Sequence, residues 1–389
     1  MILEQIRAEA RELSPRLSEW RRHLHRYPEL SYQERETAAF VAQALGAMGV
    51  RCETGMAGTG VVGYIDGVDG SRTVALRADM DALPIHEAED REYRSTRPGV
   101  MHACGHDAHT ACLLGAAAVL QRLRPPTNVK LVFQPGEEKL PGGASIMIKE
   151  GVLGGVSHIF GQHVMPLIPA GKIGVRSGKY MASSDEIYLS VRGKGGHGAQ
   201  PHLGLDPVAA AAQIIVSAQQ LVSRRADPRI PTVLTFGKVL AHGATNIIPD
   251  EVYIEGTFRT FDETWRDEAH RILKNLVEAV ATGMGASADL QIVRGYPTLV
   301  NDPELTARAR IVIESFIGAD NVVDLDLWPA SEDFAFYTQK IPGFFYRLGT
   351  RNEARGIVHG LHTPRFDVDE SALEIGAGLL AALAVESAY

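Results

Sequence analysis

The segment Val129-Lys-Leu-Val-Phe-Gln-Pro-Gly-Glu-Glu138 contains an apolar run typical of a buried strand, followed after a short turn by two adjacent carboxylates. Other strand patterns alternate along the chain with helical patterns. The strands are expected at 60–65, 73–78 and 157–163, and the helices at 109–123 and 142–150. Strands that alternate with helices indicate an α/β fold with a mixed, largely parallel sheet flanked by helices.

Residues 183–294 follow a different order of elements. Strands and helices are expected there in the order β-α-β-β-α-β, at 185–194, 206–225, 232–242, 250–260, 262–284 and 288–294. That order is typical of a ferredoxin-like unit, and Asp206 and Pro207 suit the N-cap and first residue of its first helix. The α/β pattern returns after residue 295. We therefore predict a larger domain made of 1–182 and 295–389, with an inserted α+β ferredoxin-like domain at 183–294.

The two ends of the chain are expected to be helical. Residues 2–26 carry apolar side chains at helical spacing, and a last helix is expected at about 371–387. Ser31 and Glu34 have the spacing of a capping box, which predicts that another helix begins near Ser31.

Composition bounds the class of protein. The chain has 389 residues, and its net charge of −8 argues against nucleic acid or an anionic membrane as the main partner. Three cysteines are too few for a disulfide framework. No apolar run approaches the roughly 20 residues of a membrane span. The N-terminal residues lack the apolar core of a signal peptide, so we expect a cytoplasmic protein.

The segment Met101-His-Ala-Cys-Gly-His-Asp-Ala-His109 is the densest group of metal-competent side chains. It lies just before a predicted helix, and a helix N-terminus favours the thiolate form of a cysteine. Thiolate and imidazole are both ligands of zinc and similar ions. The segment therefore indicates a metal site, the alternative being a polar turn with incidental histidines.

Carboxylates occupy the end of the next strand. Glu137 and Glu138 lie at its C-terminal edge, where open α/β sheets bind ligands. Adjacent buried carboxylates need a cation, so one is expected to bind metal and the other to take a proton from water. Two solvated loop glutamates are the alternative.

The same theme recurs elsewhere. The strand at 73–78 runs into Asp79-Met-Asp81, and the strand from Ser157 runs into His163. Three strands are thus expected to end in metal-competent residues, which strengthens the metal interpretation. His362 lies in an isolated turn. His197 stands among glycines, as in backbone close to a ligand or in a hairpin tip.

Together these motifs resemble the aminoacylase and carboxypeptidase family of two-metal hydrolases. The closest likeness is to its amidohydrolase branch of hippurate hydrolases, indole-acetyl-amino-acid hydrolases and N-acyl-diaminopimelate deacetylases. The segments that carry the resemblance span nearly the whole chain: 22–30, 77–84, 101–110, 134–138, 195–197, 246–249, 331–334 and 361–364.

The resemblance implies two divalent ions (Zn, Mn, Co or Ni) held by five ligands: Cys104, His106, Glu138, His163 and His362. It implies that Cys104 bridges the ions, that Glu137 is the general base, and that the inserted domain acts in dimerisation and as a lid. There His197 would bind the oxyanion in a partner subunit's site, within a homodimer or homotetramer.

Asn246 and Arg259, ordinary surface residues by pattern alone, resemble substrate-contacting positions. The implied reaction hydrolyses a small N-acyl amino acid to a carboxylic acid and a free amino acid.

Three other functions fit part of the pattern. A dipeptidase or carboxypeptidase would share the fold. A cysteine hydrolase would use Cys104 as nucleophile with His106 or His109 as its base, and it would give the adjacent glutamates no role. A structural zinc protein would have a closed site of Cys and His ligands without a spare carboxylate base.

Overall fold

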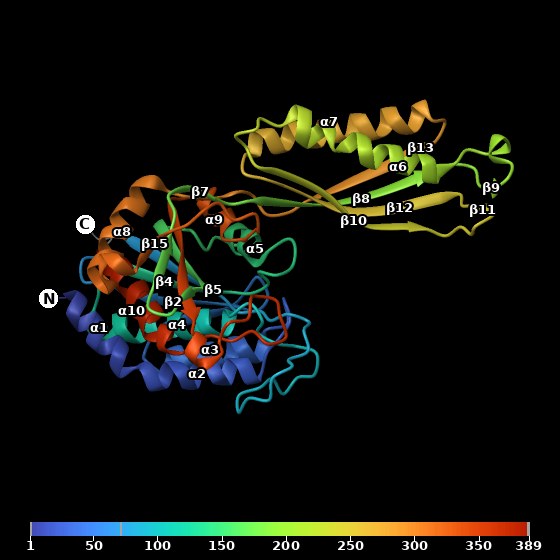
Figure 1. Ribbon diagram of the computed structural model, residues 1–389. Helices are drawn as coiled ribbons and strands as arrows, with labels where there is room; N and C mark the ends of the chain where they lie inside the picture. Colours follow the sequence, from blue (N-terminus) through green and yellow to red (C-terminus); the bar gives the residue numbers. More distant parts are fainter. Residues whose placement is uncertain (1, 71, 387–389) are drawn as a thin grey trace. The chain divides into compact units, whose positions relative to one another are not determined.

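The computed structural model describes residues 2–70 and 72–386. A mixed eight-stranded sheet forms the centre of the larger of its two units (Figure 1). Its strand order is β1-β2-β4-β3-β5-β16-β6-β15. The strands are β1 (Arg51–Met56), β2 (Gly60–Ile65), β3 (Thr73–Asp79), β4 (Asn128–Gln134), β5 (Val156–Pro169), β6 (Ile173–Val175), β15 (Val322–Asp324) and β16 (Gly343–Arg351). The centre of the sheet is parallel, since β3 pairs in parallel with β4 and β5, and β16 with β5. The expected α/β class is confirmed.

Helices of the same unit pack beside this sheet. They are α1 (Ile2–Glu12), α2 (Ser14–Arg26), α3 (Arg35–Ala47), α4 (His106–Leu123), α5 (Gly143–Lys149), α8 (Pro303–Ile317), α9 (Ala335–Thr338) and α10 (Ser371–Glu386). Helices α4 and α10 are apolar on nearly all sides because they are buried on nearly all sides. A Cβ atom on Gly115 of α4 would lie 2.7 Å from the Cβ of Ala377 of α10, so this glycine permits the close approach of the two helices.

Residues 2–26 are helical as expected, but the predicted start of the next helix is wrong. The helical region at 2–26 is two helices, which meet at Leu13. The next helix begins at Arg35 and not near Ser31, because the polar atoms of the expected capping box have other partners. The Ser31 hydroxyl donates to Asp81, and the Glu34 carboxylate accepts from the backbone N–H groups of Tyr32 and Gly136.

A second compact unit comprises Tyr180–Leu299 and Leu327–Ser331, while the remaining described residues form the first. Its sheet has the order β10-β12-β8-β13 and is antiparallel throughout. The strands and the two long helices, which lie along one face of the sheet (Figure 1), are β8 (Ser183–Arg192), α6 (Pro207–Ala218), β10 (Thr232–Ala241), β12 (Glu251–Thr260), α7 (Glu263–Gly283) and β13 (Ser287–Arg294). This is the predicted ferredoxin-like arrangement. Asp206 caps α6 as expected, accepting hydrogen bonds from Val208 N and Ala209 N.

Short elements complete the chain. They are β7 (Gly178–Met181), β9 (Gly196–His197), β11 (Ile247–Ile248), β14 (Leu299–Asn301), the 3-10 turns Pro201–Leu203, Ala319–Asn321 and Glu353–Arg355, and a π-helical turn at Leu221–Arg225. Within the described ranges, every helix is too short or too polar to span a bilayer.

Candidate metal centre

The turn before α4 presents two of the predicted ligands. Cys104 is 6% exposed and His106, the first residue of the helix, is fully buried. Between them Gly105 has φ +87°, a left-handed conformation that favours glycine. A Cβ atom at Gly105 would lie 2.4 Å from Cγ2 of Val164, so the turn can approach β5 this closely only with glycine at this position.

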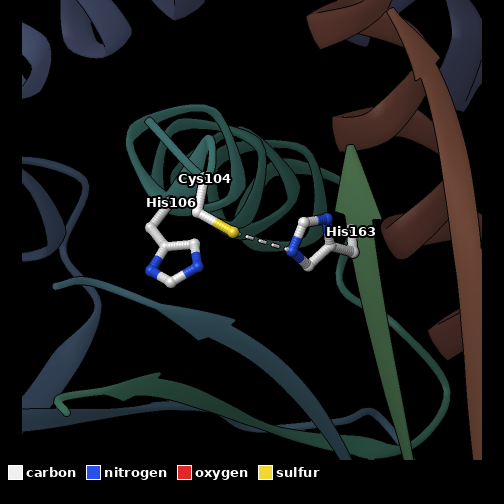
Figure 2. A group of neighbouring side chains, drawn as sticks. All are labelled: Cys104, His106 and His163. Atoms are coloured by element: carbon white, nitrogen blue, oxygen red, sulfur yellow. Dashed lines mark hydrogen bonds between the residues drawn. The ribbon is translucent and has the colours of Figure 1, made fainter. Parts of the chain in front are cut away.

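His163 comes to the same place from β5. Its Nε2 lies 3.4 Å from Sγ of Cys104, and Figure 2 shows both side chains with His106 at the start of α4. The expectation that the strand ends at His163 is wrong, since β5 continues to Pro169. His163 points into the site because β5 runs on past the end of its neighbour β3, which pairs with it only as far as Gly161.

Glu138 and His362 complete the group. His362 Nε2 lies 3.3 Å from Cys104 Sγ and 3.2 Å from Glu138 Oε1. The backbone N–H of His362 donates to the carbonyl of Ala103, which ties the distant turn to the residue before Cys104. All five residues that the resemblance implied as ligands are thus brought together from four separate segments.

The five side chains fall into two groups that share Cys104. Cys104, His106 and His163 have ligand atoms within 4.8 Å of one another, and so do Cys104, Glu138 and His362. His106 Nε2 and Glu138 Oε1 lie 3.9 Å apart, and the buried His106 Nε2 has no hydrogen-bond partner among the residues that the structure describes. Buried polar atoms without partners are costly, and thiolate, imidazole and carboxylate are suitable ligands for divalent ions. The residues present therefore fit a pair of bound metal ions.

Without a bound ion, the pKa values of Cys104 and His106 favour the protonated forms of both side chains, which cannot bind metal. Burial raises the pKa of the Cys104 thiol well above its ordinary value, and the carboxylates of Glu138 and Glu137 raise it further. Burial lowers the pKa of His106, but Asp79 and Asp81 outweigh it and raise that pKa to about 10. A divalent ion reverses this balance by favouring the deprotonated ligands.

Glu137 lies beside the ligands and is 6% exposed. Burial raises its pKa well above the ordinary range, and the neighbouring carboxylates of Glu332 and Glu138 add to the effect. Its Oε1 accepts a hydrogen bond of 3.3 Å from the backbone N–H of Asp333. A buried carboxyl group with a raised pKa, next to a metal-competent group, is suited to proton transfer.

Asp81 organises this site without being among the implied ligands. Its Oδ1 accepts from His106 Nδ1 at 3.2 Å and from Glu137 N at 3.0 Å. Its Oδ2 accepts from Ser31 Oγ at 2.6 Å and from Glu138 N at 2.9 Å. One buried carboxylate therefore fixes the ring of His106 and the backbone of both glutamates.

Asp79 and His109 lie within 4.8 Å of His106 and could be mistaken for further metal ligands. Their atoms are already in use. Asp79 accepts from Arg77 Nη1 and from His109 Nδ1, each at 2.6 Å, while His109 Nε2 accepts from Val164 N at 2.8 Å. Sequence reasoning gave His109 no role except as the base of a cysteine hydrolase, and its bonding to Asp79 and Val164 excludes a hydrogen bond from Cys104 to either ring nitrogen.

The other three predicted residues belong to the second unit. His197 in β9 pairs with Ile247 in β11, and Gly198 N donates to Asn246 O at 2.8 Å, so His197 and Asn246 are neighbours. Arg259 lies at the opposite end of the sheet. It is the ninth residue of β12, whose first residue Glu251 is on the side of β11. Along a strand this separation is roughly 26 Å.

Comparisons with known proteins agree with this geometry. Residues 75–386 match the family model described as Peptidase family M20/M25/M40. The chain is 39% identical to Thermostable carboxypeptidase 1 of Saccharolobus solfataricus, over 99% of this chain and 98% of the relative. It is 40% identical to N-acetyl-L-cysteine deacetylase of Bacillus subtilis, over 91% and 83%.

A solved structure extends the similarity to the fold. It is a dinuclear metal binding peptidase of the M20 family from Bacillus subtilis, with a TM-score of 0.84 and 36% identity. The match covers 96% of this chain and 98% of that one. These matches confirm the resemblance found in the sequence and, with it, the class of metal-dependent amide hydrolase.

Proposed function

The chain belongs to peptidase family M20/M25/M40, and from that premise we propose that it hydrolyses N-acyl amino acids to a carboxylic acid and a free amino acid. The observation that carries the proposal is the pair of ligand groups that share Cys104, with the buried carboxyl group of Glu137 beside them. One relative is named a deacetylase of an N-acetyl amino acid, which is this substrate class. Another is named a carboxypeptidase, so cleavage of a peptide bond is the second candidate.

In the proposed centre Cys104, His106 and His163 would hold one divalent ion, and Cys104, Glu138 and His362 would hold the other. When bound, the ions polarise the amide carbonyl and make a water molecule acidic enough to react near neutral pH. A pair of ions agrees with the solved relative that is described as dinuclear. Zn, Mn, Co and Ni are the candidate metals. The protein's own contribution is to hold each ligand in one orientation, for which His106 and His163 have their Nδ1 atoms tied to oxygen acceptors.

Glu137 is the proposed proton carrier. Its raised pKa allows it to take a proton from the attacking water and to return that proton to the nitrogen of the leaving amino acid. The backbone N–H of Asp333 donates to the Glu137 carboxyl group, and Asp81 accepts from Glu137 N. These two hydrogen bonds keep the carboxyl group in one position for both steps.

His197 is the proposed donor to the oxyanion. The backbone N–H of Ala199 donates to His197 Nδ1 at 3.1 Å, and a backbone N–H can only donate. The proton of the neutral ring is therefore on Nε2, where it can stabilise developing negative charge. Asn246 and Arg259 are the proposed contacts of the substrate's α-carboxylate.

We propose that the sites are completed across a homodimer, with the second unit as lid and dimerisation domain. The ends of the second unit that carry His197 and Arg259 are too far apart to line one small-molecule pocket. If Arg259 serves its own chain's site, His197 and Asn246 serve the partner's. Burial lowers the pKa of Arg259, but a guanidinium group stays charged and can bind a carboxylate.

The substrate class is tested by hydrolysis of a panel of N-acetyl, N-benzoyl and N-indole-acetyl amino acids and matched dipeptides, with and without a chelator. We expect chelator-sensitive release of amino acid from the N-acyl compounds at kcat/KM values above those for the dipeptides. Faster cleavage of dipeptides would establish the peptidase alternative. Chelator-insensitive activity would overturn both functions in favour of a cysteine hydrolase.

The shared site is tested by mixing two inactive variants, His197→Ala and Glu137→Gln. In a mixed dimer one site has Glu137 from the first chain and His197 from the second, so random exchange is expected to restore about a quarter of wild-type activity. A double variant carrying both changes in one chain is the control, since mixing it with itself restores nothing. No recovery after proven subunit exchange would show that His197 acts within its own chain.

We also place the protein in the cytoplasm. The cysteines Cys52, Cys104 and Cys112 are all free thiols, and a reducing compartment keeps the proposed ligand Cys104 able to bind metal. Fractionation of the native cells with an antibody against the chain tests this placement.

A further inference from the structure

Strand β5 has an open backbone edge next to the metal-competent side chains. It pairs with β3 from Val156 to Gly161, and β3 ends soon afterwards at Asp79. Val164 lies three residues beyond the last pair, so on this side its buried N–H has no strand to donate to. A buried backbone N–H without a partner is costly, so another group is needed at this position.

That group is the side chain of His109. Its Nε2 accepts the hydrogen bond from Val164 N at 2.8 Å. Because a backbone N–H can only donate, Nε2 carries no proton, and the proton of the neutral ring is on Nδ1, which donates to Asp79 Oδ1 at 2.6 Å. Arg77 in turn donates to Asp79 Oδ2. All three side chains are fully buried, so the orientation of His109 is fixed on both edges of its ring.

The other side of Val164 fixes His163. Its Nδ1 lies 2.7 Å from the carbonyl oxygen of Val164, which can only accept. His163 Nδ1 therefore carries the proton, and Nε2 presents a lone pair toward Cys104 Sγ, 3.4 Å away. The backbone of Val164 is held by His109 at its N–H and holds His163 at its carbonyl.

From this chain of contacts we propose that His109 is a positioning residue of the metal centre. Through the backbone of Val164 it selects the tautomer and ring orientation in which His163 offers Nε2 to an ion. The inference rests on the proposed metal centre, to which it adds a residue that touches neither ion nor substrate. The contact with Gly105, where a Cβ atom would lie 2.4 Å from Val164, places the same valine against the turn that carries Cys104.

Two substitutions separate the two bonds of His109. In His109→Gln the side-chain oxygen is the same number of bonds from Cβ as Nε2, so it can accept from Val164 N. In His109→Asn the amide nitrogen replaces Nδ1 and can donate to Asp79, but nothing accepts from Val164 N. His158→Asn is the matched control, because His158 is also a buried histidine but lies in β5, where its Nδ1 bonds to the hydroxyl of the neighbouring Ser157.

The first measurement is the affinity of each apo variant for Zn²⁺, from competition with a chromophoric chelator. We expect His109→Asn to bind one of the two ions about 10- to 100-fold more weakly than wild type. His109→Gln is expected to lose much less, and His158→Asn to match wild type. Unchanged affinity for both ions in His109→Asn would overturn the proposal. A loss in His109→Gln or in His158→Asn as large as that in His109→Asn would overturn it too.

The second measurement does not depend on metal. The ¹⁵N shifts of the His163 ring in the apo protein are expected to show a proton on Nδ1 in wild type and His109→Gln, and a mixture of tautomers in His109→Asn. One tautomer in all variants would overturn the proposal, even where His109→Asn is too unstable for the titration. Failure of wild type to bind two ions, with the tautomers as expected, would instead contradict the proposed centre.

Discussion

Replacing Asp81 by asparagine removes one negative charge and keeps the shape of the side chain. The carboxylate accepts from four donors: His106 Nδ1 and Glu137 N on one oxygen, and Ser31 Oγ and Glu138 N on the other. An amide has one oxygen, so its NH₂ group must face one of the two backbone N–H donors. Ser31 can rotate its hydroxyl to accept, but Glu137 N or Glu138 N cannot change from donor to acceptor.

The magnitude follows from that count. A buried donor left without a partner costs about 1–3 kcal/mol, and each remaining bond also loses the extra strength of a charged acceptor. We therefore expect Asp81→Asn to lower the free energy of unfolding of the apo protein by roughly 3 kcal/mol. Since either Glu138 N or both Glu137 N and His106 Nδ1 lose their acceptor, metal affinity is expected to fall by about 10- to 100-fold.

The assay combines urea unfolding of the apo protein with metal titration. Asp66→Asn is the control, because Asp66 is exposed and the same chemical change is expected to leave both quantities near wild type. The reasoning is refuted if the free energy of unfolding of Asp81→Asn lies within about 0.5 kcal/mol of wild type and the variant binds both ions as tightly. A change that small is typical of surface substitutions, not of a buried carboxylate that accepts four hydrogen bonds.

Three further outcomes are expected. Cys104→Asp is expected to keep two ions and part of the activity while Cys104→Ala loses metal, whereas a cysteine nucleophile would make both variants inactive with metal content unchanged. Gly105→Ala is expected to lower the free energy of unfolding by roughly 2–5 kcal/mol, from a left-handed φ and a clash with β5, while Gly46→Ala, with open space at its Cβ, stays near wild type. Burial raises the pKa of Asp185, but hydrogen bonds from His270 and Arg266 outweigh it and lower that pKa to about 2. Because the folded pKa lies below the unfolded one, this group stabilises the fold above about pH 4, and its roughly 2 kcal/mol is lost as the pH falls from 4 to 2. The difference in urea unfolding between wild type and Asp185→Asn is therefore expected to narrow in that window, and a constant difference would contradict the assignment.

The sequence was sufficient for the class of fold and the place of the site. The strands β4, β3 and β5 lie side by side and in parallel, with Glu137 just after β4, Asp79 at the end of β3 and His163 inside β5 beyond the end of β3. Their polar residues therefore meet near one edge of the sheet. The ferredoxin-like order of the second unit was readable because each strand and helix has its own period and turn residues, as at Asp206-Pro207.

The sequence did not indicate which of the acidic and histidine residues would bind metal and which would only hydrogen-bond to the ligands. Asp79, Asp81 and His109 are as competent for metal as the implied ligands, and only their hydrogen-bond partners distinguish them from those ligands. Those partners include backbone N–H groups of Glu137, Glu138 and Val164, which every residue has and no motif marks. The Ser31 and Glu34 pattern failed for the same reason, because side chains distant in sequence took the atoms that a local capping box would have used.

The central claim is that two ions share Cys104 and that Glu137 moves the proton without binding either ion. The most direct test measures metal content and kcat of Glu137→Gln beside wild type, on the best substrate of the panel. We predict two ions per chain in both proteins and a kcat at least about 100-fold lower in the variant. Loss of an ion in the variant would make Glu137 a ligand, and turnover at the wild-type rate would contradict its role as the base.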